Sequence, residues 1–81
     1  MFKKNIFQQN IIKLREFYGW NSAEFARQIG MSVSTTSCWE LGKRLPSIPA
    51  LWKVADLFEI SVDQLIGREP LPDWVKKGKH D

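Results

Sequence analysis

Adjacent cations and short side chains are concentrated in residues 33–47, VSTTSCWELGKRLPS. Lys43 and Arg44 follow Gly42 in a polar turn, where two neighbouring cations are suited to binding phosphate groups. The short side chains before them offer hydroxyls, a thiol and methyl groups, and they are Val33, Ser34, Ser37 and Cys38. Such groups form single hydrogen bonds or apolar contacts. The segment therefore predicts a binding surface for an anionic partner.

No catalytic or metal centre is expected from the other side chains. Cys38 is the single cysteine and His80 the single histidine, and because they are far apart in the chain we predict no Cys/His metal site. The sequence contains no nucleophile–base pair, carboxylate dyad or phosphate-binding glycine loop. We therefore predict no enzyme, no cofactor, no metal and no small-molecule substrate, while a redox role for Cys38 stays open.

The composition is that of one small globular domain. At 81 residues, with 43% hydrophobic and 26% charged residues, the chain has enough apolar material for a modest core. Polar residues 8–10 interrupt the N-terminal segment, which argues against a signal peptide, and no apolar run is long enough for a membrane span. A lone cysteine fits a reducing compartment, so we expect a cytoplasmic protein.

The net charge of +3 is distributed unevenly along the chain. Residues 1–30 carry five basic and two acidic groups, residues 31–50 two and one, and residues 51–81 five and six, so the partial sums are +3, +1 and −1. Either the excess is an ordinary solvated surface, or the first fifty residues form a basic face for an anionic partner, of which nucleic acid is the commonest.

Apolar residues recur with helical spacing, and glycines and prolines fall between the periodic segments. Phe7, Ile11, Leu14 and Tyr18 mark a first helix of about twelve residues that ends at Gly19. Four further helices are predicted: from the N-cap Asn21 to Gly30, over 33–41 to Gly42, after the N-cap Ser47, and over 62–66 to Gly67. The fold class is therefore all-α, with five short helices.

Two helix starts carry the pattern of a capping box, in which two side chains bind each other's backbone N–H groups. The pairs are Asn21 with Glu24 and Ser61 with Gln64. Residues 68–81, REPLPDWVKKGKHD, follow with two prolines and mixed charges. We expect a domain over residues 1–67 and a loosely ordered tail over 68–81, whose Trp74 packs back on the domain or takes part in dimerisation.

The second and third predicted helices are joined by three residues that include Gly30, and Ala26 is small where two helices must approach closely. These are the elements of a helix-turn-helix. From Ile11 to Gly67 the chain resembles the phage-repressor helix-turn-helix family, of the Cro-like or xenobiotic-response-element type. The segments that carry the resemblance are IIKLRE, FARQIGMS, STTSCWELGKRLPS, LWKVADLFEIS and VDQLIG.

The resemblance implies a compact, lambda-repressor-like domain that binds double-stranded operator DNA as a transcriptional regulator, commonly as a homodimer. By resemblance, Val33, Ser34 and Cys38 stand where relatives place side chains that read base edges, and Ser37 lies between them. Relatives often carry Gln, Arg, Lys or Asn there, so this chain departs from the usual pattern. Base discrimination is then expected from thymine methyls, water and DNA shape.

Six residues are predicted to contact phosphate: Asn21, Ser22, Ser32, Thr35, Lys43 and Arg44. A solvated turn is the alternative for Lys43 and Arg44. The resemblance also implies an ion pair between Arg15 and Glu40, with either a purely structural role or an additional contact to DNA.

Two functions remain open. The first is a sequence-preferring DNA-binding regulator, a repressor that acts by occupying an operator. The second is a protein-interaction module of the same fold, such as an antitoxin-like or regulator-binding domain, with weakened base readout. The short side chains on the third predicted helix favour the second function, and Lys43 with Arg44 favours the first.

Overall fold

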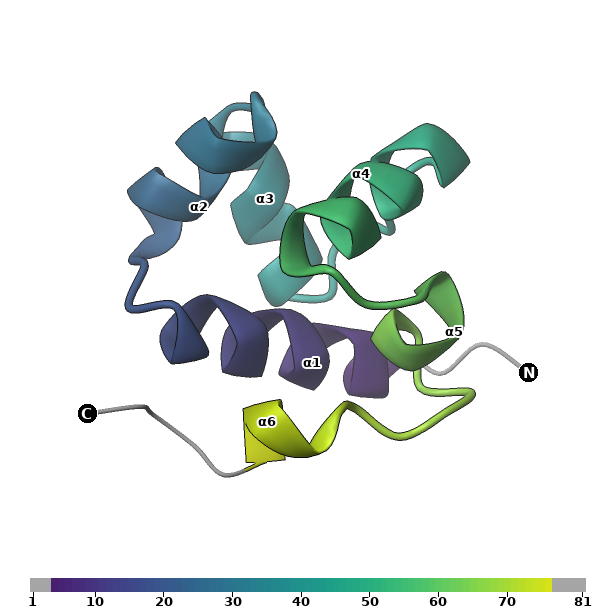
Figure 1. Ribbon diagram of the computed structural model, residues 1–81. Helices are drawn as coiled ribbons and strands as arrows, with labels where there is room; N and C mark the ends of the chain where they lie inside the picture. The colour runs from purple at the N-terminus through teal and green to yellow at the C-terminus, as the bar shows by residue number, and fades with distance from the viewer. Residues whose placement is uncertain (1–3, 77–81) are drawn as a thin grey trace.

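The computed structural model describes residues 4–76, and this part of the chain contains six short helices joined by turns and loops (Figure 1). They are α1 (Lys4–Phe17), α2 (Ser22–Ile29), α3 (Val33–Glu40), α4 (Ile48–Phe58), α5 (Val62–Leu65) and α6 (Asp73–Lys76). Within residues 4–76 there is no β-strand, so the all-α prediction is confirmed, and the count of five helices is one too few. His80 and the end of the predicted tail lie outside the described residues.

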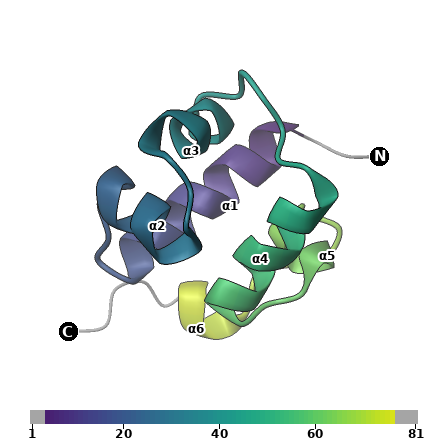
Figure 2. The same ribbon diagram turned by 90° about the horizontal axis from the view of Figure 1, so that it is seen from above.

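The longest helix, α1, packs against α3, α5 and α6. Its residues Phe7, Ile11 and Leu14 have no exposed surface, which confirms the predicted apolar stripe. Tyr18 lies one residue beyond the end of the helix and is half-buried. Seen from above, α3 lies to one side of α1 and α4 and α5 lie to the other, while α2 overlaps one end of α1 (Figure 2).

One apolar core joins these helices. It is formed by Phe7, Ile11, Leu14, Phe25, Ile29, Trp39, Ala50, Val54, Ala55, Phe58, Leu65, Leu71 and Val75. Phe58 of α4 is central to its aromatic part, because its ring centroid lies 5.7 Å from that of Phe25, 5.4 Å from that of Tyr18 and 5.9 Å from that of Trp20. The core therefore fixes α2 and the segment before it against α4.

The short helix α5 is held at both ends by side chains. Ser61 and Gln64 form the predicted capping box at its start. At its end, the buried Asn10 of α1 donates from Nδ2 to the carbonyl oxygens of Gln64 and Leu65, at 3.1 and 3.0 Å. These bonds satisfy helix-terminal carbonyls that would otherwise lack a partner.

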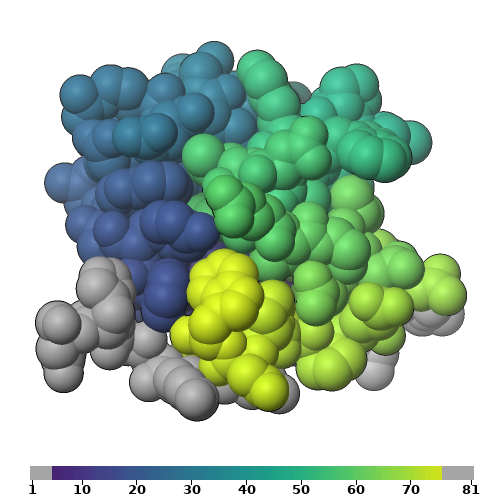
Figure 3. All heavy atoms as spheres, viewed as in Figure 1, coloured from purple at the N-terminus to yellow at the C-terminus, as the bar shows by residue number. Residues whose placement is uncertain are grey.

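A sixth helix forms within the segment expected to be a loosely ordered tail after Gly67, and Trp74 packs back on the domain as expected. Leu71 and Val75 are buried in the core, and the Trp74 ring centroid lies 5.2 Å from that of Phe17. In the space-filling view the yellow atoms of this segment lie beside the blue end of α1 (Figure 3). Pro72 is compatible with the helix because it stands before the first turn, where an N–H is not needed, and its carbonyl accepts from the Val75 N–H.

Candidate nucleic-acid interface

The turn between α2 and α3 is set by its two caps. Gly30 ends α2 in the left-handed conformation, at φ 75°. Ser32 then begins α3, because its hydroxyl oxygen accepts from the Thr35 N–H at 3.1 Å. The buried Ala26 lets the two helices pack closely. Two short helices joined by a three-residue turn form the predicted helix-turn-helix.

The start of α2 differs from the prediction in one respect. Asn21 accepts from the Glu24 N–H at 2.8 Å, as expected of an N-cap. The Glu24 carboxylate, however, accepts from the side chains of Arg27 and Gln28 one turn further on, and it does not complete a capping box. The predicted box was wrong because a cation at i+3 and an amide at i+4 compete for the same carboxylate.

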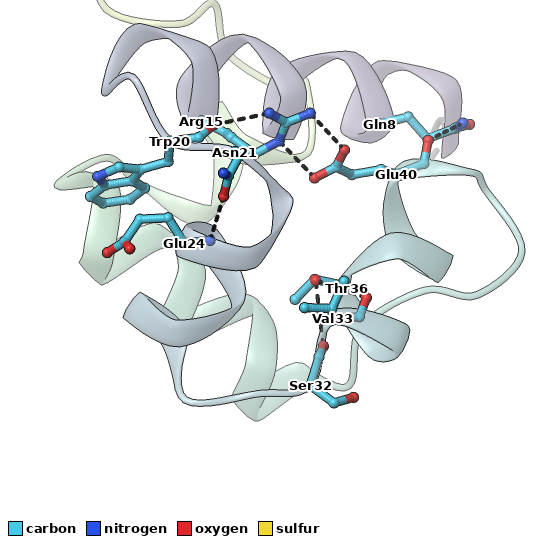
Figure 4. Close-up of polar contacts among 9 residues, drawn as sticks. All are labelled: Gln8, Arg15, Trp20, Asn21, Glu24, Ser32, Val33, Thr36 and Glu40. Carbon is cyan, nitrogen blue, oxygen red and sulfur yellow. Dashed lines mark hydrogen bonds and ion pairs between the residues drawn. The ribbon is translucent and has the colours of Figure 1, made fainter.

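The inner face of α3 anchors this helix. Thr36 and Trp39 are buried, and their spacing of three positions places both on the same face of the helix. The Thr36 hydroxyl donates to the Val33 carbonyl oxygen at 3.2 Å, so it has a partner within the helix (Figure 4). Because both residues are fixed, the opposite face of α3 is presented in a defined orientation.

The outer face of α3 carries short and uncharged side chains. Val33 is 44% exposed, and Ser34 and Thr35 are also exposed. Ser37 and Cys38 are only half-buried, so each offers a partial surface. Val33 and Ser34, in the first turn of α3, are therefore the more exposed part of this face, and Ser37 and Cys38 are the less exposed part.

The residues predicted to contact phosphate lie at the start of α2, at the start of α3 and in the turn after α3. Lys43 and Arg44 are exposed, and their backbone N–H groups both donate to the Cys38 carbonyl oxygen, at 2.9 and 3.3 Å. Within residues 4–76 neither side chain is part of an ion pair. Asn21 is exposed at the start of α2, and Ser22 next to it is half-buried. Both therefore lie where a helix N-terminus favours an anion.

The hydroxyls of Ser32 and Thr35 are engaged with each other. Their oxygens are 2.9 Å apart, and the Ser32 oxygen also caps α3. A phosphate contact from these two residues would have to share or replace that bond.

Arg15 joins α1 to α3 and to the segment before α2. Its Nε and Nη2 donate to the two carboxylate oxygens of Glu40, each at 3.0 Å, and its Nη1 donates to the Trp20 carbonyl oxygen at 3.0 Å (Figure 4). One contact here was missed by the sequence reasoning: Gln8 of α1 donates from Nε2 to the Glu40 carbonyl oxygen at 3.1 Å. No local pattern predicts a contact between residues 32 positions apart.

A family model described as Helix-turn-helix matches residues 11–65, which is more than half of the 81 residues. This chain belongs to the helix-turn-helix family. The match spans every residue predicted to contact base edges or phosphate, and it stops before α6. Gln8 likewise lies outside it. The helix-turn-helix described above is therefore the family's shared part, and Gln8 and α6 lie beyond it.

Three relatives carry regulatory names. The HTH-type transcriptional regulator AnsR of Bacillus subtilis (strain 168) is 39% identical over 59 residues, which are 73% of this chain and 51% of AnsR. The cryptic phage CTXphi transcriptional repressor RstR of Vibrio cholerae serotype O1 is 34% identical over 61 residues, 75% of this chain and 54% of RstR. The uncharacterized HTH-type transcriptional regulator YazB of Bacillus subtilis (strain 168) is 37% identical over 60 residues, 74% of this chain and 87% of YazB.

This chain spans about half the length of AnsR and of RstR. No solved structure matches it significantly. Among the helices that the structure describes, none is long and apolar enough to cross a membrane. Over residues 4–76, no three or more His, Cys, Asp or Glu side chains are grouped so that they could hold a metal ion.

Proposed function

We propose that this chain binds double-stranded DNA with α3 in the major groove and regulates transcription by occupying an operator. One arrangement supports this function best: the outer face of α3 is exposed at its start, and the exposed cations Lys43 and Arg44 stand in the turn after the helix ends at Glu40. A helix of this width fits the major groove, and cations at its end then reach the sugar-phosphate backbone. The match of residues 11–65 to the helix-turn-helix family and the regulatory names of its relatives agree with this function.

Phosphate contacts supply most of the affinity in this proposal. Lys43 and Arg44 bind the backbone at one edge of the groove, and the N-terminus of α2, at Asn21 and Ser22, binds it at the other. Since Lys43 and Arg44 have no ion-pair partner within residues 4–76, binding a phosphate breaks no such bond. Such contacts fix the register of the protein on the duplex and carry little sequence information.

We assign base discrimination mainly to the first turn of α3. The methyl groups of Val33 contact a thymine C5-methyl, and the hydroxyl of Ser34 bonds a base edge or a water. Ser37 and Cys38 are half-buried and contribute smaller, mostly van der Waals contacts. Because none of these side chains makes a bidentate bond to a base, DNA shape contributes a large share of the preference.

We further propose that the chain is a cytoplasmic repressor of the Cro-like, xenobiotic-response-element type and that it acts as a homodimer. RstR is named a repressor, which favours repression over activation here. A single domain of this size makes few contacts, and two half-sites about one DNA turn apart are the usual remedy. Helix α5 and the tail after residue 67, where Trp74 is 38% exposed, are the surfaces proposed for the second copy.

A protein-interaction module is the second candidate, and one observation favours it. Ile48 and Trp52 lie one turn apart on α4 and are 71% and 61% exposed, and Leu45 just before them is half exposed. Large apolar side chains that remain in solvent are typical of surfaces that bind other proteins. In this candidate the short, uncharged face of α3 reads no DNA.

Salt dependence of duplex binding separates the two functions. Fluorescence anisotropy with a labelled duplex, repeated from low to high salt, should show an affinity that falls steeply and linearly on a logarithmic plot. Absence of binding at low salt, or an affinity indifferent to salt, would eliminate the DNA-binding proposal. Selection of bound duplexes from a random pool would then give the preferred sequence.

A further inference from the structure

The side chain of Gln8 binds the backbone at the end of α3. Its Nε2 donates to the carbonyl oxygen of Glu40 at 3.1 Å, whereas Arg15 holds the carboxylate of the same residue (Figure 4). Both α1 side chains therefore converge on Glu40, but they constrain different parts of it. Arg15 fixes the side chain, and Gln8 fixes the backbone from which the following turn begins.

The same amide group lies against Gly42. A Cβ atom built on Gly42 would be 2.8 Å from Gln8 Oε1, 2.9 Å from Cδ and 3.0 Å from Nε2, so the Gln8 amide occupies the space that any larger residue would need. Gly42 also has φ +77°, a conformation that favours glycine. The Gln8 side chain of α1 is thus in contact with the turn after α3.

This turn carries the two cations of the proposed DNA-binding surface. The N–H groups of Lys43 and Arg44 donate to the Cys38 carbonyl oxygen, so their backbone continues directly from the end of α3. Because neither side chain has an ion-pair partner within residues 4–76, their position depends on the backbone of the turn. A shift of that backbone would move both cations away from the phosphates.

We infer that Gln8 is a positioning residue for phosphate binding, and that it acts through the turn that carries Lys43 and Arg44. The inference rests on the proposed DNA-binding function. A displaced turn lowers the fraction of molecules that can bind with both cations, and the apparent affinity falls by the same factor. Since a neutral hydrogen bond makes a modest net contribution, we expect a loss of roughly three- to tenfold on removing it.

The test is a double-mutant cycle between Gln8 and the two cations. Gln8→Met keeps the length of the side chain but removes the donor, and Gln8→Leu removes the donor with a shorter apolar side chain, so neither variant adds a charge. Both are measured on one duplex in the natural background and in the Lys43→Ala/Arg44→Ala background, after thermal unfolding shows which are folded at the assay temperature. The control is Gln9→Met, at the next, exposed position of α1.

Gln8→Met should weaken DNA binding roughly three- to tenfold in the natural background and should have almost no effect once the two cations are gone. Gln8→Leu should behave in the same way, so the cycle survives if one variant fails to fold. Gln9→Met should bind like the natural chain. An equal loss in both backgrounds, or no loss in either, would overturn the inference and leave the DNA-binding function standing. If the natural chain shows no salt-dependent binding, the proposed function and this inference fail together.

Discussion

Arg15 and Glu40 face each other in a bidentate ion pair, with both N–O distances at 3.0 Å. The two side chains are only 16% and 11% exposed. Since the third guanidinium nitrogen donates to the Trp20 carbonyl oxygen, every nitrogen of Arg15 binds a protein atom. This geometry favours the structural role of the pair over a contact to DNA, because the guanidinium already joins α1, α3 and the segment before α2.

Removing Arg15 should therefore destabilise the fold strongly. Arg15→Met leaves a nearly buried carboxylate without its partner, and we expect the free energy of unfolding to fall by about 3 kcal/mol. The double variant Arg15→Met/Glu40→Met should be less destabilised than Arg15→Met alone, because no unpaired charge remains. Urea unfolding at neutral pH measures both. A single variant within about 0.5 kcal/mol of the natural chain would contradict a structural role.

The two cations of the α3–α4 turn give a prediction about salt. Lys43→Ala/Arg44→Ala should weaken binding to all duplexes alike and make the slope of log affinity against log salt shallower by up to about 2, or roughly 0.9 for each phosphate that is no longer neutralised. Stability should hardly change, since both side chains are exposed. Arg68→Ala, which removes one exposed cation after α5 that is paired with Asp63, is the control for a loss of positive charge elsewhere. A weaker affinity for some sequences only would speak against phosphate binding by these two residues.

Val33 gives a prediction about a single base pair. Val33→Ala should lose preference at one thymine-containing position by roughly fivefold, because up to two methyl groups leave an apolar contact, on the order of 1 kcal/mol. Replacing that thymine with uracil removes the partner methyl and should weaken binding of the natural chain similarly. The two changes together should weaken DNA binding no more than either change alone. Selection from a random pool with both proteins locates the position, and identical preferences would exclude the methyl contact.

Features set by neighbours in the sequence were predictable. The N-caps Asn21, Ser32 and Ser61 bind N–H groups three residues away, and each is readable from a short pattern. The inner face of α3 is local in the same way, because Thr36 and Trp39 are three positions apart on one helix. Glu24 was the local exception, because Arg27 and Gln28 offered it alternative partners that the capping pattern does not weigh.

Features set by tertiary approach were not predictable from pattern. The contact of Gln8 with Glu40 and that of Asn10 with the end of α5 join residues 32 to 55 positions apart. Neither amide has a distinctive sequence context. Helix α6 was not predicted, because two prolines precede it and prolines are typical of irregular segments. The burial of Leu71 and Val75 depends on the surface that α1 offers.

Helix α6 should contribute measurably to stability. Leu71→Ala removes a buried side chain, and we expect the free energy of unfolding to fall by about 2 kcal/mol or more. Asp73→Ala, at an exposed position two residues later and inside α6, should change it by less than about 0.5 kcal/mol. Urea unfolding of the full chain compares the two. Equal stabilities of Leu71→Ala and the natural chain would show that this segment is not part of the core in solution.

Tyr18 links stability to alkaline pH. Its burial, together with the nearby carboxylate of Glu59, raises the pKa of its hydroxyl above the ordinary value. Because the folded chain then holds this proton more tightly than the unfolded chain, the stabilising contribution is complete below about pH 10 and is lost as pH rises through the folded-state pKa.

Tyr18 is the single tyrosine of the chain, so phenolate absorbance reports its titration directly. The midpoint should lie higher in the folded chain than in urea, and Glu59→Gln should lower it in part, since burial remains. Between about pH 9 and pH 11, the free energy of unfolding should fall less for Tyr18→Phe than for the natural chain. The comparison of the two proteins cancels the titration of lysines, because both contain the same lysines. Coincident midpoints in buffer and in urea would rule out this linkage.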